Sequence, residues 1–320
     1  MAAMNTARTQ QKGWGRIAAA IRRHAAVYLA EWKQPAPFDW RAALWLCGAS
    51  LILLPLTTRL PALAYEWPLY RAGVFNATYP PWLQLAISPL AIWEWRTGAA
   101  LLFGLLFMSV AIGTAREARG QSRGSMLGGV LLALVTAPVL MLLWEGNASI
   151  LTLMGVIMLP LGVPWATVQP HLAPWALLAR RSWTLWGLGF LAFTLIVWGP
   201  WPLQILMNVE GSLAHPIAMG WVNLGWPILL IGLALLPFTN ADPLRLIAAG
   251  AFVAPYLMAV HLVLLLPAIG RVTGWRRVAL WLCAWLTLLP AMFYSDAAKL
   301  AAMIFPLAVW WLLKPAAQAS

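Results

Sequence analysis

The carboxylate of Glu66 is the side chain in this sequence best placed for chemistry. It stands in a polar run, Tyr65–Arg71, between stretches that are strongly apolar. A carboxylate in such a loop is a candidate general base, because it can take the proton of a hydroxyl group that attacks a substrate. A structural alternative stays open, and composition alone favours it: Glu66 forms an ion pair with Arg59 or Arg71.

Three further polar side chains stand in apolar surroundings. Tyr79 precedes two prolines, and proline suits the first turn of a helix. Asn147 follows a long apolar run, so it either caps the helix that begins near Ser149 or offers its amide to a sugar hydroxyl. His261 lies in the middle of an apolar segment, where a lone histidine is more often a hydrogen-bonding residue than a catalyst.

Motifs for other kinds of chemistry are missing from the sequence. It contains no Walker loop, no dinucleotide-binding glycine fingerprint, no haem motif and no His/Cys cluster with metal-ligand spacing. Cys47 and Cys283 fall inside apolar runs, which is typical of inert core residues. We therefore expect no metal site, no cofactor and no disulfide framework.

The elements that must hold these side chains are helices in a membrane. Hydrophobic residues make up 62% of the chain and charged residues only 9%, with a mean hydropathy of +0.77, whereas soluble domains hold about 25% charged residues. A helix of ~20 apolar residues crosses the hydrocarbon core, and apolar stretches near that length recur here. The sequence predicts an all-α polytopic membrane protein with about 8–10 transmembrane helices, some of them broken or half-length.

The positive charge indicates orientation rather than nucleic-acid binding. The net charge is +12, but the basic residues gather at the ends of apolar spans, where they set which side of the membrane a loop occupies. The clusters 116–123, 180–181 and 271–277 should therefore be cytoplasmic. Both termini should be cytoplasmic too, which predicts a multi-pass protein of the cytoplasmic (inner) membrane.

Residues 1–41 are expected to form a basic cytoplasmic arm, and residues 42–315 an integral membrane domain. Within the arm, residues 14–33 have the pattern of an amphipathic helix with an apolar stripe and a basic face. Such a helix either lies on the membrane, with its basic face toward anionic lipid headgroups, or packs against the cytoplasmic side of the protein itself. The residues of the stripe are Trp14, Ile17, Ile21, Ala25, Tyr28 and Trp32, and those facing away are Lys12, Arg16 and Arg23.

Counting crossings predicts that residues 59–97, with Glu66, stay outside as one loop carrying interfacial helices. The first span is then 42–58, and the next is 98–115. The stretches 126–144 and 183–206 read as continuous spans. Other later segments are interrupted, and 244–270, with Pro255 near its middle, reads as two half-helices that enter and leave on one side. Broken helices at membrane depth are tolerated where they are buried or line a cavity, so we expect a cavity near the outer face.

Several of these features, in order, resemble glycosyltransferase family 87, whose members are multi-spanning enzymes of the GT-C fold. The resemblance covers roughly residues 42–270. It rests on the following segments: Glu66–Arg71, Tyr79–Pro81 with Ser88–Leu90, Glu145–Asn147, Gln169–His171 before Arg180–Trp183, and Ala254–Tyr256 through His261–Leu265.

The resemblance implies a hexosyltransferase that moves a sugar from a polyprenyl-phosphate donor to a hydroxyl acceptor on the outer face, with inversion. Glu66 would be the catalytic base. The implied substrate-binding residues are Arg71, Tyr79, Asn147, Gln169, His171 and His261. The implied partners are the bilayer and the lipid-linked sugar, with a larger membrane complex as a further possibility and no nucleic acid.

The chain departs from the family pattern at three of these positions. Glu66 replaces the usual aspartate, Gln169 replaces a lysine that precedes proline, and His261 replaces an aspartate. The departures leave a second hypothesis open, in which the chain is a catalytically inactive GT-C-like subunit or scaffold. A transporter ranks below both, because the sequence shows no inverted repeat.

Overall fold

The structure, a computed structural model, describes residues 2–30, 79–83, 87, 95–208 and 210–313, and all regular elements in these ranges are helices. The first expected span, 42–58, lies outside the described residues, as do Glu66 and Arg71. The helices of the first half are α1 (Ala2–Ala30), α5 (Trp95–Glu117), α6 (Arg123–Leu134), α7 (Ala137–Glu145), α8 (Ser149–Ile157), α9 (Val163–Ala166), η2 (Ala173–Ala179) and α10 (Arg181–Trp198).

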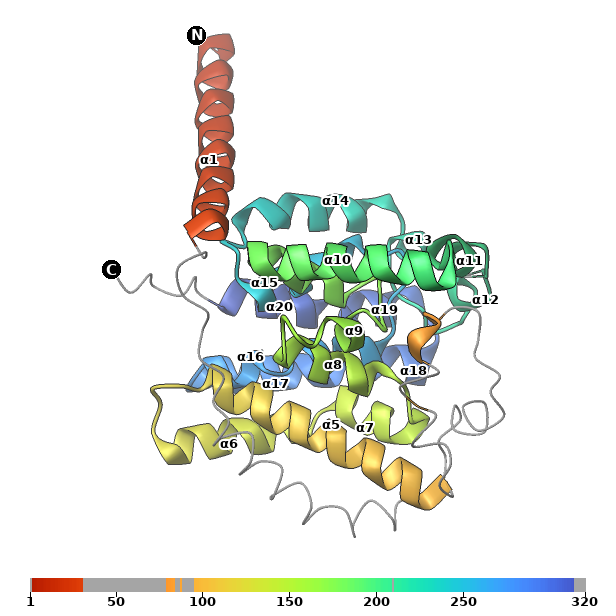
Figure 1. Cartoon of the computed structure of the whole chain (residues 1–320). Coiled ribbons are helices and arrows are strands. Elements are labelled where there is room, and N and C mark those ends of the chain that lie inside the picture. The colour runs from red at the N-terminus through yellow and green to blue at the C-terminus, as the bar shows by residue number, and fades with distance from the viewer. Residues whose placement is uncertain (1, 31–78, 84–86, 88–94, 209, 314–320) are drawn as a thin grey trace.

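The second half continues the same pattern of short and interrupted helices. It comprises α11 (Trp201–Asn208), α12 (Glu210–Leu213), α13 (Trp221–Leu224), α14 (Trp226–Leu235), η3 (Leu236–Phe238), α15 (Pro243–Val253), η4 (Ala259–Leu265), α16 (Ala268–Arg271), α17 (Trp275–Leu286), α18 (Leu289–Phe293), α19 (Asp296–Ala302) and α20 (Ile304–Leu312). Most of the longer helices run along one general direction, and α1 stands across it (Figure 1).

Two described stretches, 100–117 and 275–293, are long and apolar enough to cross a membrane, and two bent helix pairs raise the number to four. α5 has 23 residues, which at 1.5 Å per residue spans about the ~30 Å hydrocarbon core. The coarse prediction, an all-helical chain with apolar spans, is confirmed for the described part. The larger number of crossings and the GT-C arrangement remain predictions.

The outer surface of the bundle suits contact with lipid. In α10 only Gly187 and Thr194 are buried, and the apolar side chains around them are open, Ile196 with 85% of its surface exposed. A helix that exposes apolar groups on nearly all sides has no place on a water-soluble surface. Lipid tails cover such a helix without the free-energy cost of exposing apolar side chains to water.

Two stretches that were predicted to be continuous spans are broken in the structure. The segment 126–144 bends by 47° between α6 and α7, and 183–206 bends by 84° between α10 and α11. Proline explains both bends, because it lacks the backbone N–H and collides with the preceding turn. Pro138 lies in the first turn of α7, and Pro200 follows Gly199, which has a φ of 67°.

The expectation for 244–270 agrees with the structure. α15 begins at its N-cap Asp242, whose carboxylate accepts hydrogen bonds from the backbone N–H groups of Leu244 and Arg245. α16 ends at Arg271, and the Arg271 guanidinium forms an ion pair with Asp242. Since the two ends of the segment are in contact, its two halves enter and leave the bundle on the same side.

We call this side the basic end, defined by Arg116, Arg180, Arg245, Arg271 and Arg277. Arg277 is a structural link there: its guanidinium donates to the carbonyl groups of Ile269, Val272 and Ser125 and to the side chain of Gln121. It thereby ties the start of α6 to the connection between α16 and α17. The opposite end holds the turn from α7 to α8 and the helices α11, α12, α13, α18 and α19 (Figure 1).

Helix α1 lies against the basic end. It begins at Ala2, twelve residues before the expected start at 14, and it contacts η3. The Nδ1 atom of His24 accepts a hydrogen bond from the backbone N–H of Ala241 at 3.2 Å and lies 3.4 Å from Thr239 Oγ1. Packing on the protein, one of the two alternatives, is therefore present. Ile21 on the predicted stripe remains 52% exposed and available to lipid.

The docking of α1 should depend on pH through His24. Burial lowers the pKa of His24 below its ordinary value of 6.5, because the charged ring loses hydration. Only the neutral ring offers an acceptor to the backbone N–H of Ala241. The stabilisation from docking is then complete above pH 6.5 and is lost as the pH falls toward the lowered pKa. With spin labels at Arg22→Cys and Arg119→Cys and no other cysteines, distance distributions should be narrow at pH 7.5 and broaden at pH 5.5.

His24→Gln is the control for this measurement, since glutamine keeps an acceptor that does not titrate in this range. Its distance distribution should be the same at both pH values. Equal broadening in the His24→Gln variant would show that another group controls the docking.

Candidate functional site

A chain of hydrogen bonds joins three of the residues predicted to bind substrate. Asn147 Nδ2 donates to the hydroxyl of Tyr79 at 3.4 Å, and Ser149 Oγ donates to Asn147 Oδ1 at 2.5 Å. Gln169 Nε2 donates in turn to Ser149 Oγ. Asn147, Ser149 and Gln169 are each at most 3% exposed. We call Tyr79, Asn147, Ser149 and Gln169 the polar chain.

The local sequence explains how these side chains meet. Gly146 ends α7 in the left-handed conformation, with a φ of 65°, which glycine adopts without steric cost. The chain turns back there, and the Asn147 side chain also accepts from the backbone N–H of Ser149 at 2.9 Å, next to the start of α8. Tyr79 is held by its neighbour Trp82, whose indole donates to the Pro164 carbonyl at 2.8 Å.

Two histidines form a second cluster beside the polar chain. His171 Nε2 and His261 Nδ1 are 3.0 Å apart, and the backbone N–H of Met258 also donates to His261 Nδ1 at 3.1 Å. Because His261 Nδ1 accepts from Met258, we assign its proton to Nε2 and make His171 Nε2 the donor. Tyr256 packs edge-on against both rings. Only Pro170 separates His171 from Gln169, so the two clusters adjoin.

The structure thus brings together Tyr79, Asn147 and Gln169 in one group, and His171 with His261 in another. Glu66 and Arg71 lie outside the described residues. Asn147 has the expected capping role and is also a link in the polar chain. These positions leave the substrate-binding roles as predictions, because hydrogen-bonded residues in a membrane protein also serve structure alone.

One buried acceptor in the polar chain has no partner. Gln169 Oε1 makes no hydrogen bond within the described part of the protein, and Gln169 is 2% exposed. A buried polar atom without a partner costs roughly 1–3 kcal/mol. A hydroxyl donor, such as that of a sugar or of water, would satisfy it. The clusters otherwise offer amide, hydroxyl and imidazole groups, which suit the binding of hydroxyl-rich compounds and the movement of a proton.

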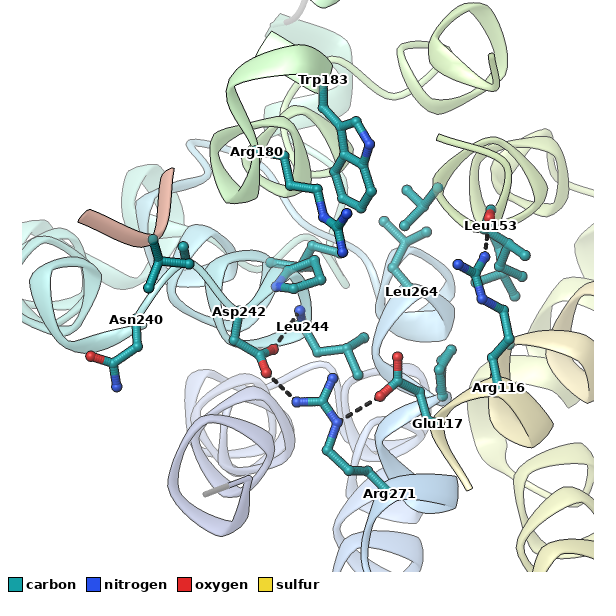
Figure 2. A pocket seen from close by; sticks show the side chains of 18 of the residues that line it. Arg116, Glu117, Leu153, Arg180, Trp183, Asn240, Asp242, Leu244, Leu264 and Arg271 are labelled. Atoms are coloured by element: carbon teal, nitrogen blue, oxygen red, sulfur yellow. Dashed lines mark hydrogen bonds and ion pairs between the residues drawn. The ribbon is translucent and has the colours of Figure 1, made fainter. Parts of the chain in front are cut away.

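A cavity of about 630 Å³ lies at the basic end, which the sequence predicts to be cytoplasmic. The cavity expected near the outer face remains a prediction. Both halves of the broken segment 244–270 line the cavity at the basic end, with Leu244 and Ile247 from α15 and Leu264 from η4. Figure 2 shows Arg180 and Arg271 reaching toward each other from opposite sides. Its described polar lining is Arg23, Arg116, Glu117, Arg180, Asn240, Asp242 and Arg271, and its main apolar lining is Val27, Leu153, Val156, Ile157, Trp183, Ile247, Leu264 and Pro267.

The two carboxylates of the cavity are engaged by one arginine. Arg271 Nε lies 2.6 Å from Glu117 Oε2, and the same guanidinium contacts Asp242 Oδ2 (Figure 2). These side chains are only partly open, with Asp242 8% and Arg271 22% exposed. Arg116 donates to the Ile157 carbonyl at 2.5 Å, and the Arg180 guanidinium lies 4.8 Å from the centre of the Trp183 ring.

The loop before α15 completes this wall of the cavity in a strained form. Asn240 and Ala241 have φ values of 52° and 55°, a left-handed conformation that costs about 1–3 kcal/mol per non-glycine residue. His24 and the Asp242 cap hold the loop in place. From the sequence, these arginines were predicted only to mark the cytoplasmic side. That arginines from four separate segments line one cavity is a finding of the fold.

In the described part of the chain, no group of three His, Cys, Asp or Glu side chains is placed to hold a metal ion. Comparison with protein-family models, curated proteins and solved structures finds no match to this chain.

Removing an inner member of the polar chain and removing its last member should affect stability differently. Asn147→Leu loses two hydrogen bonds accepted by Oδ1 and should destabilise the protein by about 1–3 kcal/mol. Gln169→Leu also removes the unpartnered acceptor, so its net effect should stay below about 1 kcal/mol. Thermal unfolding of the purified variants in detergent measures both. A larger loss in Gln169→Leu would mean that Oε1 has a partner in the folded protein.

Proposed function

We propose that this chain is a membrane glycosyltransferase. It takes a sugar from a polyprenyl-phosphate donor and transfers it to a hydroxyl acceptor on the outer face of the cytoplasmic membrane. In this proposal the basic end is cytoplasmic, as the positive-inside rule favours, and both termini lie on that side.

The observation that carries the proposal is the polar chain with its adjoining histidine pair. Residues that the family resemblance selects from distant parts of the sequence, Asn147, Gln169 and His261 among them, lie in adjoining buried clusters (hydrogen bonds at 2.5–3.4 Å between Tyr79, Asn147 and Ser149). Asn147 follows α7 at the end of the bundle away from the arginines. Gln169 Oε1 is buried without a hydrogen-bond partner in the described part of the protein, and hydroxyl groups of a sugar are donors of the right kind.

The proposed mechanism is a single displacement at the sugar carbon that bears the lipid phosphate. The Glu66 carboxylate takes the proton of the acceptor hydroxyl as that oxygen forms the new bond, and the lipid phosphate leaves with the electron pair. Arg71 and the polar chain hold the donor. Inversion follows from the single displacement.

The scaffold hypothesis remains the alternative, and one observation favours it. In both clusters the side chains mainly satisfy one another: Asn147 with Ser149, and His171 with His261. Mutual satisfaction is also what a structural polar core requires. In the alternative, the chain transfers no sugar and purifies with a fixed membrane partner.

Glu66→Gln separates the two hypotheses, because a glutamine amide cannot take the proton from the hydroxyl group of the acceptor. Purified protein in lipid, supplied with polyprenyl-phosphate sugars and hydroxyl acceptors, should lose roughly 10²–10⁴-fold in transfer rate. The matched control is Glu210→Gln, an exposed acid elsewhere in the chain, which should transfer at the original rate. Transfer that survives Glu66→Gln would refute the assigned base, and no transfer by the unaltered protein would favour the scaffold.

A further inference from the structure

The cavity at the basic end is lined by several arginines and, on its other side, by an apolar wall. Four arginines and two carboxylates line it within the described residues, which leaves two positive charges in excess. Both carboxylates are already in contact with Arg271. Arg23, Arg116 and Arg180 bring three further guanidinium groups to the lining.

Two other arginines at the basic end have a purely structural role. Arg245 is 6% exposed, donates to the Trp310 carbonyl at 3.1 Å and lies over the Trp310 ring at 4.6 Å. Arg277 is 8% exposed and donates mainly to backbone carbonyls. Neither lines the cavity. The cavity arginines differ because they surround open space.

The opposite wall is apolar and leads into the bundle. Leu153, Val156 and Ile157 come from α8, and Leu264 comes from η4. A soluble anion would gain nothing from such a wall, whereas a lipid tail would be covered by it.

We propose that this cavity binds the phosphate group of an anionic lipid, with the first part of the lipid tail against the α8 and η4 wall. Planar guanidinium groups match the oxygens of a phosphate, and four of them line this cavity within the described residues. The volume of about 630 Å³ lies in the ~300–1,000 Å³ range of small-molecule sites. It holds a headgroup and the start of a tail, while the rest extends into the bilayer.

Helix α1 has a part in this site. Arg23 and Val27 line the cavity from α1, and α1 stands across the bundle at this end (Figure 1). An interfacial helix at the level of the headgroups would meet the lipid where its phosphate lies. The site is separate from the polar chain and does not depend on the proposed glycosyl transfer.

The test is lipid binding by the full chain in detergent. The probes are dioctanoyl phosphatidic acid, dioctanoyl phosphatidylcholine and inorganic phosphate, measured by native mass spectrometry and by the shift in thermal unfolding. Phosphatidic acid should bind and raise the unfolding temperature, and the other two should give little change. Arg116→Gln and Arg180→Gln should each weaken phosphatidic acid binding about tenfold or more.

Matched controls keep the result interpretable. Arg22→Gln removes an exposed arginine of α1, and Arg119→Gln removes one in the turn after α5. Both residues lie outside the lining, and both variants should bind like the unaltered protein. Val156→Trp fills the apolar half without changing charge and should weaken phosphatidic acid binding. Variants are compared only where their unfolding without lipid matches that of the unaltered protein.

Three outcomes would overturn the proposal. Equal binding of phosphatidic acid and phosphatidylcholine would show that charge is not recognised. An equal effect of inorganic phosphate, insensitive to Val156→Trp, would assign the site to a soluble phosphate instead of a lipid. Equal losses of phosphatidic acid binding in Arg116→Gln and Arg119→Gln would show that general surface charge, and not the cavity, causes the binding.

Discussion

The ion pairs of Arg271 hold together the part of the structure on which the rest depends. One guanidinium contacts Asp242 at the start of α15 and Glu117 at the end of α5. It therefore closes the segment 242–271 on itself and fastens it to the apolar span of α5. Charged groups at the edge of a low-dielectric region are stable only when paired in this way, so the pairing determines which ends of which helices meet.

Two polar regions follow from that arrangement, one toward each end of the bundle. α8 connects them, because Ser149 at its start belongs to the polar chain and Ile157 at its end lines the cavity. Nine residues of α-helix separate these points by about 12 Å. η4 makes a second connection, from His261 to Leu264. A lipid phosphate bound at one end and a sugar bound toward the other would thus contact the same two elements.

Coarse features were predictable from the sequence because they depend on composition. Apolar length and the placement of arginines indicated helices in a membrane, and Pro255 with arginines at both ends of 244–270 indicated a segment that returns to its starting side. The bends at Pro138 and Pro200 were missed, since a proline near the start of a helix and a proline that breaks a span look alike in sequence. The extension of α1 to Ala2 was also missed, because those residues lack apolar periodicity.

Side-chain groupings were less accessible to sequence reasoning. Asn147, Gln169 and His261 were selected through a family resemblance, and their closeness depends on the Gly146 turn and on the short helix η4, which no spacing rule predicts. The cavity arginines carry two signals at once. Their positions mark an orientation, and only the fold shows that Arg23, Arg116, Arg180 and Arg271 also surround one space.

The orientation of the two ends is the claim on which the account rests, and cysteine labelling measures it directly. In a protein whose Cys47 and Cys283 are replaced by alanine, single cysteines are placed at Arg119, at the basic end, and at His215, an exposed residue between α12 and α13. A membrane-impermeant maleimide applied to intact cells should label His215→Cys at once and Arg119→Cys only after permeabilisation. Labelling of Arg119→Cys in intact cells would invert the orientation, placing the arginine cavity outside and the proposed sugar site in the cytosol.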